Sequence, residues 1–189
     1  AEVGVPCKTS LVTGIVVRGI VEQSELADLV VLGRAGEHSQ WLDGLVGSTT
    51  AGVVRRTSRP VLVTASDTPG DQRLVVAYDG SPHAKRALQQ GALLSAEWRL
   101  ACSVLVVGED EARGPLDEAR AYLESHGVAA HYERRPGDPS EVIVAYAGEV
   151  QADLLVMGAY GHTKVRELVV GSTTAYALNR APCPLLLSR

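Results

Sequence analysis

The stretch that decides the fold reads Gly158-Ala159-Tyr160-Gly161-His162-Thr163-Lys164-Val165-Arg166-Glu167-Leu168-Val169-Val170-Gly171-Ser172-Thr173-Thr174. It follows an apolar run of strand length, Asp153–Met157, and precedes residues 175–180, which can continue as a helix. The glycines are therefore expected at the carboxyl end of a strand and at the amino end of a helix. Open α/β sheets bind ligands at that edge, where unpaired N–H groups and the helix dipole favour an anion.

Each residue type in the spacing Gly-x2-Gly-x9-Gly-Ser-Thr has a physical role. Gly158 and Gly161 lack the Cβ atom that would keep a ligand away from the backbone, and both allow a positive φ in the turn. Gly171 does the same just before the helix, and Ser172 can either cap that helix or donate to a phosphate oxygen. A single copy of the pattern fits a plain strand-to-helix loop with a serine cap almost as well.

A second copy of the pattern favours a ligand-binding loop over a plain connection. Gly33 and Gly36 are followed after ten residues by Gly47-Ser48-Thr49, again behind an apolar run, Asp28–Leu32. From there residues 47–63 match residues 171–187 without a gap. Repetition over this length indicates two related units.

The chain resembles the universal stress protein family, whose nucleotide-binding members carry this glycine pattern and an aspartate after their first strand. That strand and aspartate read here Val75-Val76-Ala77-Tyr78-Asp79-Gly80-Ser81. The resemblance covers 73–189 as a whole domain and 1–65 as an incomplete first unit, with 66–72 as a linker, so the chain looks like a tandem-type member. It implies an α/β fold, Rossmann-like, in which each unit has an open parallel five-stranded sheet of order 3-2-1-4-5 with helices on both faces.

The function that the resemblance implies is that of an ATP-binding regulatory protein of the stress response, with or without Mg²⁺. Adenine would meet the backbone near Val107, the ribose would meet Asp79 and Gly158, and the phosphates would rest on the N–H groups after Gly161 and Gly171. The full set of implied positions is Ala77, Asp79, Val107, Met157, Gly158, Gly161, Gly171, Ser172 and Thr173. A second implied site comprises Gly33, Gly36, Gly47, Ser48 and Thr49.

Two other functions stay open. The additional residue between Gly36 and Gly47, with Trp41 in that loop, favours an interaction module without nucleotide for the first unit. A weak ATP hydrolase is the other alternative, because Lys164 and Arg166 lie inside the glycine loop. Efficient catalysis is not expected, since the sequence has no Gly-x4-Gly-Lys-Ser/Thr loop and no nucleophile beside a general base.

Composition argues against nucleic acid and a membrane as partners, and it indicates the cellular compartment. A formal net charge of −4 provides no basic field for nucleic acid, and no apolar run approaches the roughly 20 residues that span a bilayer. Cys7, Cys102 and Cys183 are far apart in the sequence, so we expect reduced structural thiols in a cytoplasmic protein and no metal site.

The first unit begins at what would be its third strand. Residues 4–14 align with residues 127–137, so the matching first and second strands are missing and a third strand would have no neighbour. We expect the missing segment to exist in the natural protein or to come from another chain. The alternative is that residues 1–23 take a conformation foreign to the family.

Strand pairing and helix starts can also be predicted. The two units are expected to pair through their last strands, Val61–Val63 and Leu185–Leu187, because an exposed apolar edge needs a partner. The resemblance to the family also implies a homodimer. Helices are expected to start at Ser81-Pro82 and at Asp138-Pro139, each with a capping residue before proline. The counterpart of the second start, residues 15–18, lacks these residues, so its helix should be less well defined.

Overall fold

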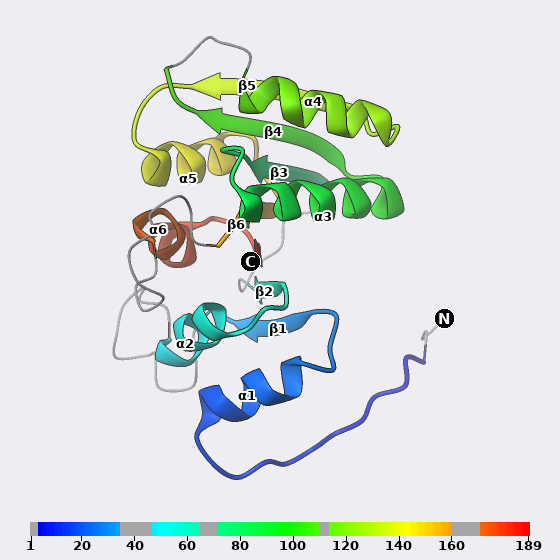
Figure 1. Cartoon of the computed structure of the whole chain (residues 1–189), viewed down its shortest axis with the longest axis vertical. Helices are drawn as coiled ribbons and strands as arrows, with labels where there is room; N and C mark the ends of the chain where they lie inside the picture. The colour runs from blue at the N-terminus through cyan, green and yellow to red at the C-terminus, as the bar shows by residue number, and fades with distance from the viewer. Residues whose placement is uncertain (1–3, 35–46, 65–71, 110–113, 160–170) are drawn as a thin grey trace.

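The chain folds around one mixed β-sheet, described in a computed structural model over residues 4–34, 47–64, 72–109, 114–159 and 171–189 (Figure 1). The helices are α1 (Val16–Ser24), α2 (Ser48–Arg56), α3 (Pro82–Trp98), α4 (Pro115–Ser125), α5 (Pro139–Glu149) and α6 (Ser172–Arg180). The strands are β1 (Val30–Gly33), β2 (Val61–Thr64), β3 (Arg73–Ala77), β4 (Ala101–Val107), β5 (Ala130–Arg135), β6 (Leu154–Gly158) and β7 (Leu185–Ser188).

The sheet has seven strands in the order β1-β2-β7-β6-β3-β4-β5, so the predicted five-stranded sheet is wrong as a complete description. Its parallel part, β3 to β7, does follow the predicted order 3-2-1-4-5. The sheet continues because β2 pairs antiparallel with β7, with Leu62 opposite Leu186, and β1 pairs parallel with β2. The predicted pairing of the two last strands is thereby confirmed within one chain.

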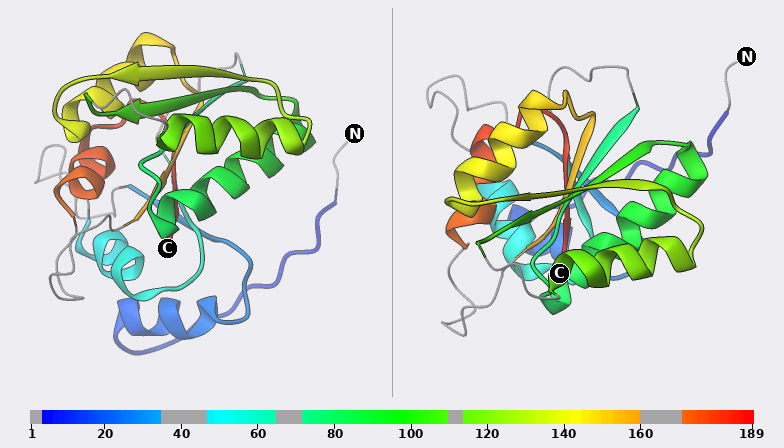
Figure 2. Two further views of the ribbon diagram at one scale, coloured as in Figure 1. Left: turned by 45° about the horizontal axis from the view of Figure 1, so that its top comes forward. Right: turned by 90° about the horizontal axis from the view of Figure 1, so that it is seen from above.

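Helices lie on both faces of the sheet, and the core is divided accordingly (Figure 2). Helices α1, α2, α5 and α6 cover one face, where Val61, Leu155 and Leu187 are buried. Helices α3 and α4 cover the other, where Val76 and Val156 are buried. Strands with both faces covered read as unbroken apolar runs, which explains why β4 and β6 are recognisable in the sequence.

The predicted helix starts are confirmed at α3 and α5. Ser81 Oγ accepts a hydrogen bond from the Ala84 amide at 3.1 Å, and Asp138 Oδ1 accepts one from the Ser140 amide at 2.8 Å. Each satisfies an amide that a helix start leaves unpaired. Helix α1 forms as well, but it is two residues shorter than α5 and Ile15 supplies no side-chain cap.

The predicted third strand of the first unit does not form. Residues 4–13 have no regular secondary structure, and their side chains are exposed. Their backbone leads from the N-terminal side of the molecule to the start of α1 (Figure 1). A strand needs a neighbour for its N–H and C=O groups, and none of the described residues supplies one. Of the predicted linker, 66–72, only Gln72 belongs to the described residues, and the rest lies outside them.

Candidate functional site

A cavity of about 290 Å³ lies at the carboxyl ends of β3, β4 and β6. Parallel sheets place ligands at this edge, because the loops after neighbouring strands diverge there. Its volume is at the lower end of the roughly 300–1,000 Å³ that ligand pockets span. The residues that line it are Ala77, Tyr78, Asp79, Ser81, Ala84, Leu105, Val107, Pro139, Ile143, Met157, Gly158, Gly171, Ser172, Thr173 and Thr174.

Three helix starts converge on this cavity: those of α3, α5 and α6. The starts of α3 and α5 have side-chain caps, whereas α6 begins at Gly171 without one from the described residues. The first amides of α6 thus remain available to an anion, and the helix dipole adds to the attraction. Ser140 Oγ donates to Thr173 Oγ1 at 3.5 Å and links the starts of α5 and α6.

Asp79 is held at the mouth of the cavity by a tight turn. Its Oδ1 accepts a hydrogen bond from the Ser81 amide at 2.9 Å, and Gly80 takes a φ of +78°, which favours glycine. The carboxylate remains exposed. It can therefore accept hydrogen bonds from hydroxyl groups of a ligand that enters from the sheet edge.

The two described glycines of the motif, Gly158 and Gly171, have different structural roles. A Cβ atom on Gly158 would lie 2.7 Å from the Ala84 nitrogen, so this glycine lets β6 touch the start of α3. A Cβ atom on Gly171 would meet no described atom within 4 Å, so the space beside it is open. Gly158 is thus needed for packing, and Gly171 leaves room at the start of α6.

Burial and nearby charges favour the neutral forms of Tyr78 and His83 near the cavity. Burial, and secondarily the nearby Glu118 carboxylate, raises the pKa of Tyr78, so its hydroxyl stays neutral at physiological pH. Burial also lowers the pKa of His83, and the charge of Arg86 adds to this effect. No group of His, Cys, Asp and Glu side chains within the described ranges could hold a metal ion. The cavity thus presents the start of α6 to an anion and the Asp79 carboxylate to hydrogen-bond donors.

The cavity brings together eight of the nine predicted positions of the second unit, and the ninth, Gly161, lies outside the described residues. Sequence reasoning missed several lining residues: Tyr78, Ser81, Ala84, Leu105, Pro139, Ile143 and Thr174. The Asp138-Pro139 cap was visible in the sequence, but only the fold shows that α5 starts beside α6.

The first glycine motif has the same local backbone. Gly47 precedes α2 with φ −55° and ψ 139°, against φ −54° and ψ 142° at Gly171. Here Gly33, Gly47, Ser48 and Thr49 are described, whereas Gly36 is not. The Gly47 amide donates to the Arg34 carbonyl at 3.2 Å, and Thr50 Oγ1 donates to the Gly33 carbonyl at 2.9 Å. Arg34 Nη2 donates to the Cys183 carbonyl at 3.0 Å, and burial lowers the pKa of this guanidinium.

Comparison with known proteins places these features in one family. A model of the universal stress protein family matches residues 1–65 and 106–189. A universal stress protein of Synechocystis sp. is 34% identical over 168 residues, which cover 86% of this chain but only 58% of that protein. The chain thus spans little more than half the length of that relative.

Solved structures show the same fold. A universal stress protein of Archaeoglobus fulgidus superposes with a TM-score of 0.75 at 26% identity, over 92% of this chain and 64% of the other. A universal stress protein in complex with cAMP superposes with a TM-score of 0.53 at 23% identity, over 62% of this chain and 97% of the other. Across the described residues, no helix is both long and apolar enough to cross a membrane.

Proposed function

The chain belongs to the universal stress protein family, and we propose that it is an ATP-binding regulatory protein of the stress response whose nucleotide occupies the cavity beside Asp79. The observation that carries this proposal is the convergence of an uncapped helix start, an exposed carboxylate and a motif glycine on one hollow. The α6 amides suit phosphates, and the Asp79 carboxylate suits the hydroxyls of a ribose.

The proposed pose places the base deeper than the phosphates. Val107, Met157 and Ile143 give the cavity an apolar part, which fits the faces of an adenine. Gly171, Ser172 and Thr173 lie at the start of α6, where the phosphates would bind together with any Mg²⁺ they bring. The cAMP complex supports this proposal to the extent that a related fold accommodates an adenine nucleotide.

We further propose that the chain is a tandem of an incomplete unit, 1–65, and a complete unit, 73–189, joined by a linker at 66–72. The support is local: β1–α2–β2 and β6–α6–β7 have the same order, and α2 and α6 each have nine residues with nearly equal backbone angles at the preceding glycine. A second, weaker nucleotide site at Gly33, Gly47, Ser48 and Thr49 follows from this division, as does Gly36 as its sequence-based member. The homodimer and the cytoplasmic location stay predictions from sequence.

Calorimetric titration with Mg-ATP, together with thermal unfolding, tests the nucleotide site. Ligand at about 100 times its Kd should stabilise the fold by about 2.7 kcal/mol through mass action. Gly171→Val should abolish this effect, because its side chain would fill the open space at the start of α6. Gly47→Val is the matched control, since the same backbone angles occur at the equivalent position of the first motif.

The outcomes separate the candidate functions. Heat of binding that survives in Gly47→Val and is lost in Gly171→Val supports the site beside Asp79. The reverse pattern would move the nucleotide to the first motif, and no heat at saturating ATP would overturn the proposal in favour of an interaction module. Phosphate release that is lost in Lys164→Ala would show a hydrolase instead of a purely regulatory protein.

A further inference from the structure

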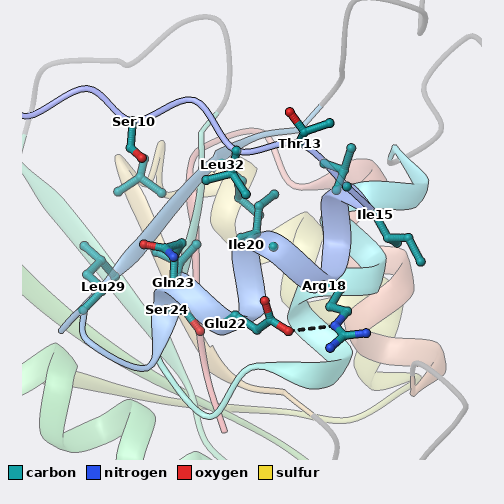
Figure 3. Close-up of a pocket in the computed structure, with 17 residues that line it drawn as sticks. Ser10, Thr13, Ile15, Arg18, Ile20, Glu22, Gln23, Ser24, Leu29 and Leu32 are labelled. Atoms are coloured by element: carbon teal, nitrogen blue, oxygen red, sulfur yellow. Dashed lines mark hydrogen bonds and ion pairs between the residues drawn. The ribbon is translucent and has the colours of Figure 1, made fainter.

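Two ion pairs of nearly equal length have different structural roles. Arg18 Nε lies 2.7 Å from Glu22 Oε1 beside a hollow of about 750 Å³ between α1 and β1, and this pair joins successive turns of one helix (Figure 3). Lys85 Nζ lies 2.6 Å from Glu118 Oε1, and this pair joins α3 to α4. The second pair therefore fixes two helices against each other.

The pair of Lys85 and Glu118 lies beside the turn that carries Asp79. A Cβ atom on Gly80 would lie 3.5 Å from Pro115 Cγ and 3.8 Å from Glu118 Oε2. The first turn of α4 thus packs on this turn, and Gly80, with a φ of +78°, leaves the contact free of a side chain. Figure 2 shows α3 and α4 together on one face of the sheet.

Tyr78 connects Glu118 to the strand that ends at the cavity. Its side chain is 3% exposed in the core under α3 and α4, and its amide donates to the Leu105 carbonyl at 2.9 Å. The hydroxyl group is buried and makes no hydrogen bond of ordinary geometry within the described residues. Burial raises the pKa of this hydroxyl most, and Glu118 is close enough to raise it further. Tyr78 is thus fixed at its backbone and at its side chain, and Asp79 follows it directly.

The direction of the Asp79 carboxylate depends on this turn. Its Oδ1 accepts from the Ser81 amide at 2.9 Å, and the side chain is otherwise exposed at the mouth of the cavity. Hydrogen bonds weaken steeply when the angle at the hydrogen falls below about 120°, so a small rotation of the carboxylate matters to a ligand hydroxyl. Because the turn packs on α4 through Gly80, a shift of α4 would move Asp79 as well.

We infer that Glu118 is a positioning residue of the nucleotide cavity, and that it sets the preference of this cavity for a nucleotide with free ribose hydroxyls. Held by Lys85, Glu118 keeps the start of α4 against Gly80, and the turn then directs the Asp79 carboxylate toward the ribose. Glu118 is not among the residues that line the cavity, so it acts through the turn and not on the ligand. The inference rests on the proposed function and adds to it the residue that makes the site selective for ribose.

Calorimetric titration of the full 189-residue chain with Mg-ATP and with Mg-2′,3′-dideoxy-ATP tests the inference. The wild-type protein should bind ATP at least about tenfold more tightly, because the dideoxy nucleotide lacks the hydroxyls that donate to Asp79. Glu118→Ala should reduce this preference by roughly threefold or more, through a higher Kd for ATP and an unchanged Kd for the dideoxy nucleotide. Lys85→Met should act in the same direction, since Glu118 then loses its partner.

Two other acidic residues provide matched controls. Glu22→Ala removes an ion-paired glutamate of similar exposure, 57% against 47% at Glu118, beside a hollow that shares no lining residue with the cavity. Asp117→Ala removes the neighbouring acid from the same first turn of α4. Both variants should keep the preference for ATP, which would show that neither net charge nor the α4 dipole accounts for the effect of Glu118→Ala.

Hydrogen exchange provides a readout without nucleotide. The Ser81 amide donates to Asp79 Oδ1 at 2.9 Å, and the Ser140 amide makes the same kind of bond to Asp138 Oδ1 at 2.8 Å. In Glu118→Ala, the exchange rate of the Ser81 amide measured by NMR should rise by roughly threefold or more, because the turn opens more often. The rate at Ser140 should stay unchanged and serves as the internal reference.

The outcomes separate this inference from the proposed function. No binding of either nucleotide by the wild-type protein would overturn both. Binding of ATP with the same preference in Glu118→Ala as in the wild type would overturn the inference alone, and so would an equal loss of affinity for both nucleotides. An unchanged exchange rate at Ser81 in Glu118→Ala would also overturn it, because the turn would then not depend on α4.

Discussion

A Cβ atom on Gly158 would lie 2.7 Å from the backbone nitrogen of Ala84, so the end of β6 and the start of α3 are in contact through backbone atoms. The same contact positions Ser81 and Asp79 at the cavity, because both residues lie just before α3. Packing and ligand geometry therefore depend on the same glycine.

Gly158→Ala should destabilise the fold by about 1–3 kcal/mol, the usual cost of overpacking a close contact. The backbone at Ala84 cannot rotate away as a side chain could, so α3 must shift. Urea unfolding measures the change in the free energy of unfolding. Gly171→Ala is the matched control and should stay within about 0.5 kcal/mol, because no described atom lies near its added methyl group. Equal stability of the two variants would contradict this reading of Gly158.

Gly91→Ala should also be destabilising, although alanine usually stabilises a helix. A Cβ atom at this position would lie 2.6 Å from Val76 Cγ2, and Val76 is fully buried in β3. Here the obstacle is a side chain, so Val76→Ala should relieve part of the effect. A double-mutant cycle by urea unfolding should give a favourable coupling of about 0.5–3 kcal/mol between the two substitutions. Additive effects would show that the clash is absent.

The fold was largely predictable because its signals are local. Apolar runs mark β4 and β6, and capping residues mark α3 and α5. A five-stranded sheet describes only β3 to β7, because the predicted pairing of β2 with β7 joins β1 and β2 to the same sheet. Residues 4–13 were predicted as a strand from their alignment with residues 127–137, but β5 forms beside β4, whereas no described strand lies beside residues 4–13.

Glu118 should titrate below the usual range of a glutamate. Lys85 Nζ lies 2.6 Å from Glu118 Oε1, and this hydrogen bond lowers the pKa of the carboxyl group, with Tyr78 adding a smaller effect. A carboxyl whose folded pKa is lowered stabilises the fold above its unfolded pKa, and that contribution is lost as pH falls through the folded pKa.

NMR titration of the Glu118 side chain measures this pKa, and Lys85→Met should raise it toward the usual range. Because both side chains are about half exposed, the change in stability should stay below about 1 kcal/mol. An unchanged titration midpoint in Lys85→Met would show that the ion pair is absent in solution.

The three cysteines should differ sharply in reactivity. Burial raises the pKa of Cys102 and Cys183 to about 11, whereas Cys7 is exposed. Ellman's reagent at pH 8 should therefore titrate one thiol quickly in the native protein and three after denaturation. Two rapidly reacting thiols in the native protein would contradict the burial of one of the pair.

The same burial predicts an alkaline loss of stability. A thiol with a raised folded pKa stabilises the fold below its unfolded pKa of about 9, and the contribution is lost as pH rises toward 11. Thermal unfolding across this range should show a falling midpoint, and the fall should be smaller in Cys102→Ala. An equal fall in that variant would assign the loss to other groups.

The candidate site was predictable to the extent that its residues belong to the glycine motif or follow a strand. Asp79 was implied by the resemblance to the family, whereas Gly171 was found because a glycine just before a helix has a specific geometric use. Leu105 and Ile143 carry no such signal, since an apolar residue in a strand or helix looks the same whether it faces a core or a ligand. Their role in lining the cavity appears only when β4 and α5 are placed around it.

The reversal of strand direction between β2 and β7 has a consequence for how the molecule meets its surroundings. Strands β6 and β7 end on one rim of the sheet, whereas β1 and β2 end on the opposite rim. The carboxyl ends of β6 and β1, which carry Gly158 and Gly33 of the two motifs, therefore lie on opposite rims of the sheet. Among the described strands, β1 is connected to β6 only through β2 and β7, so the two glycine motifs share one sheet without sharing a rim.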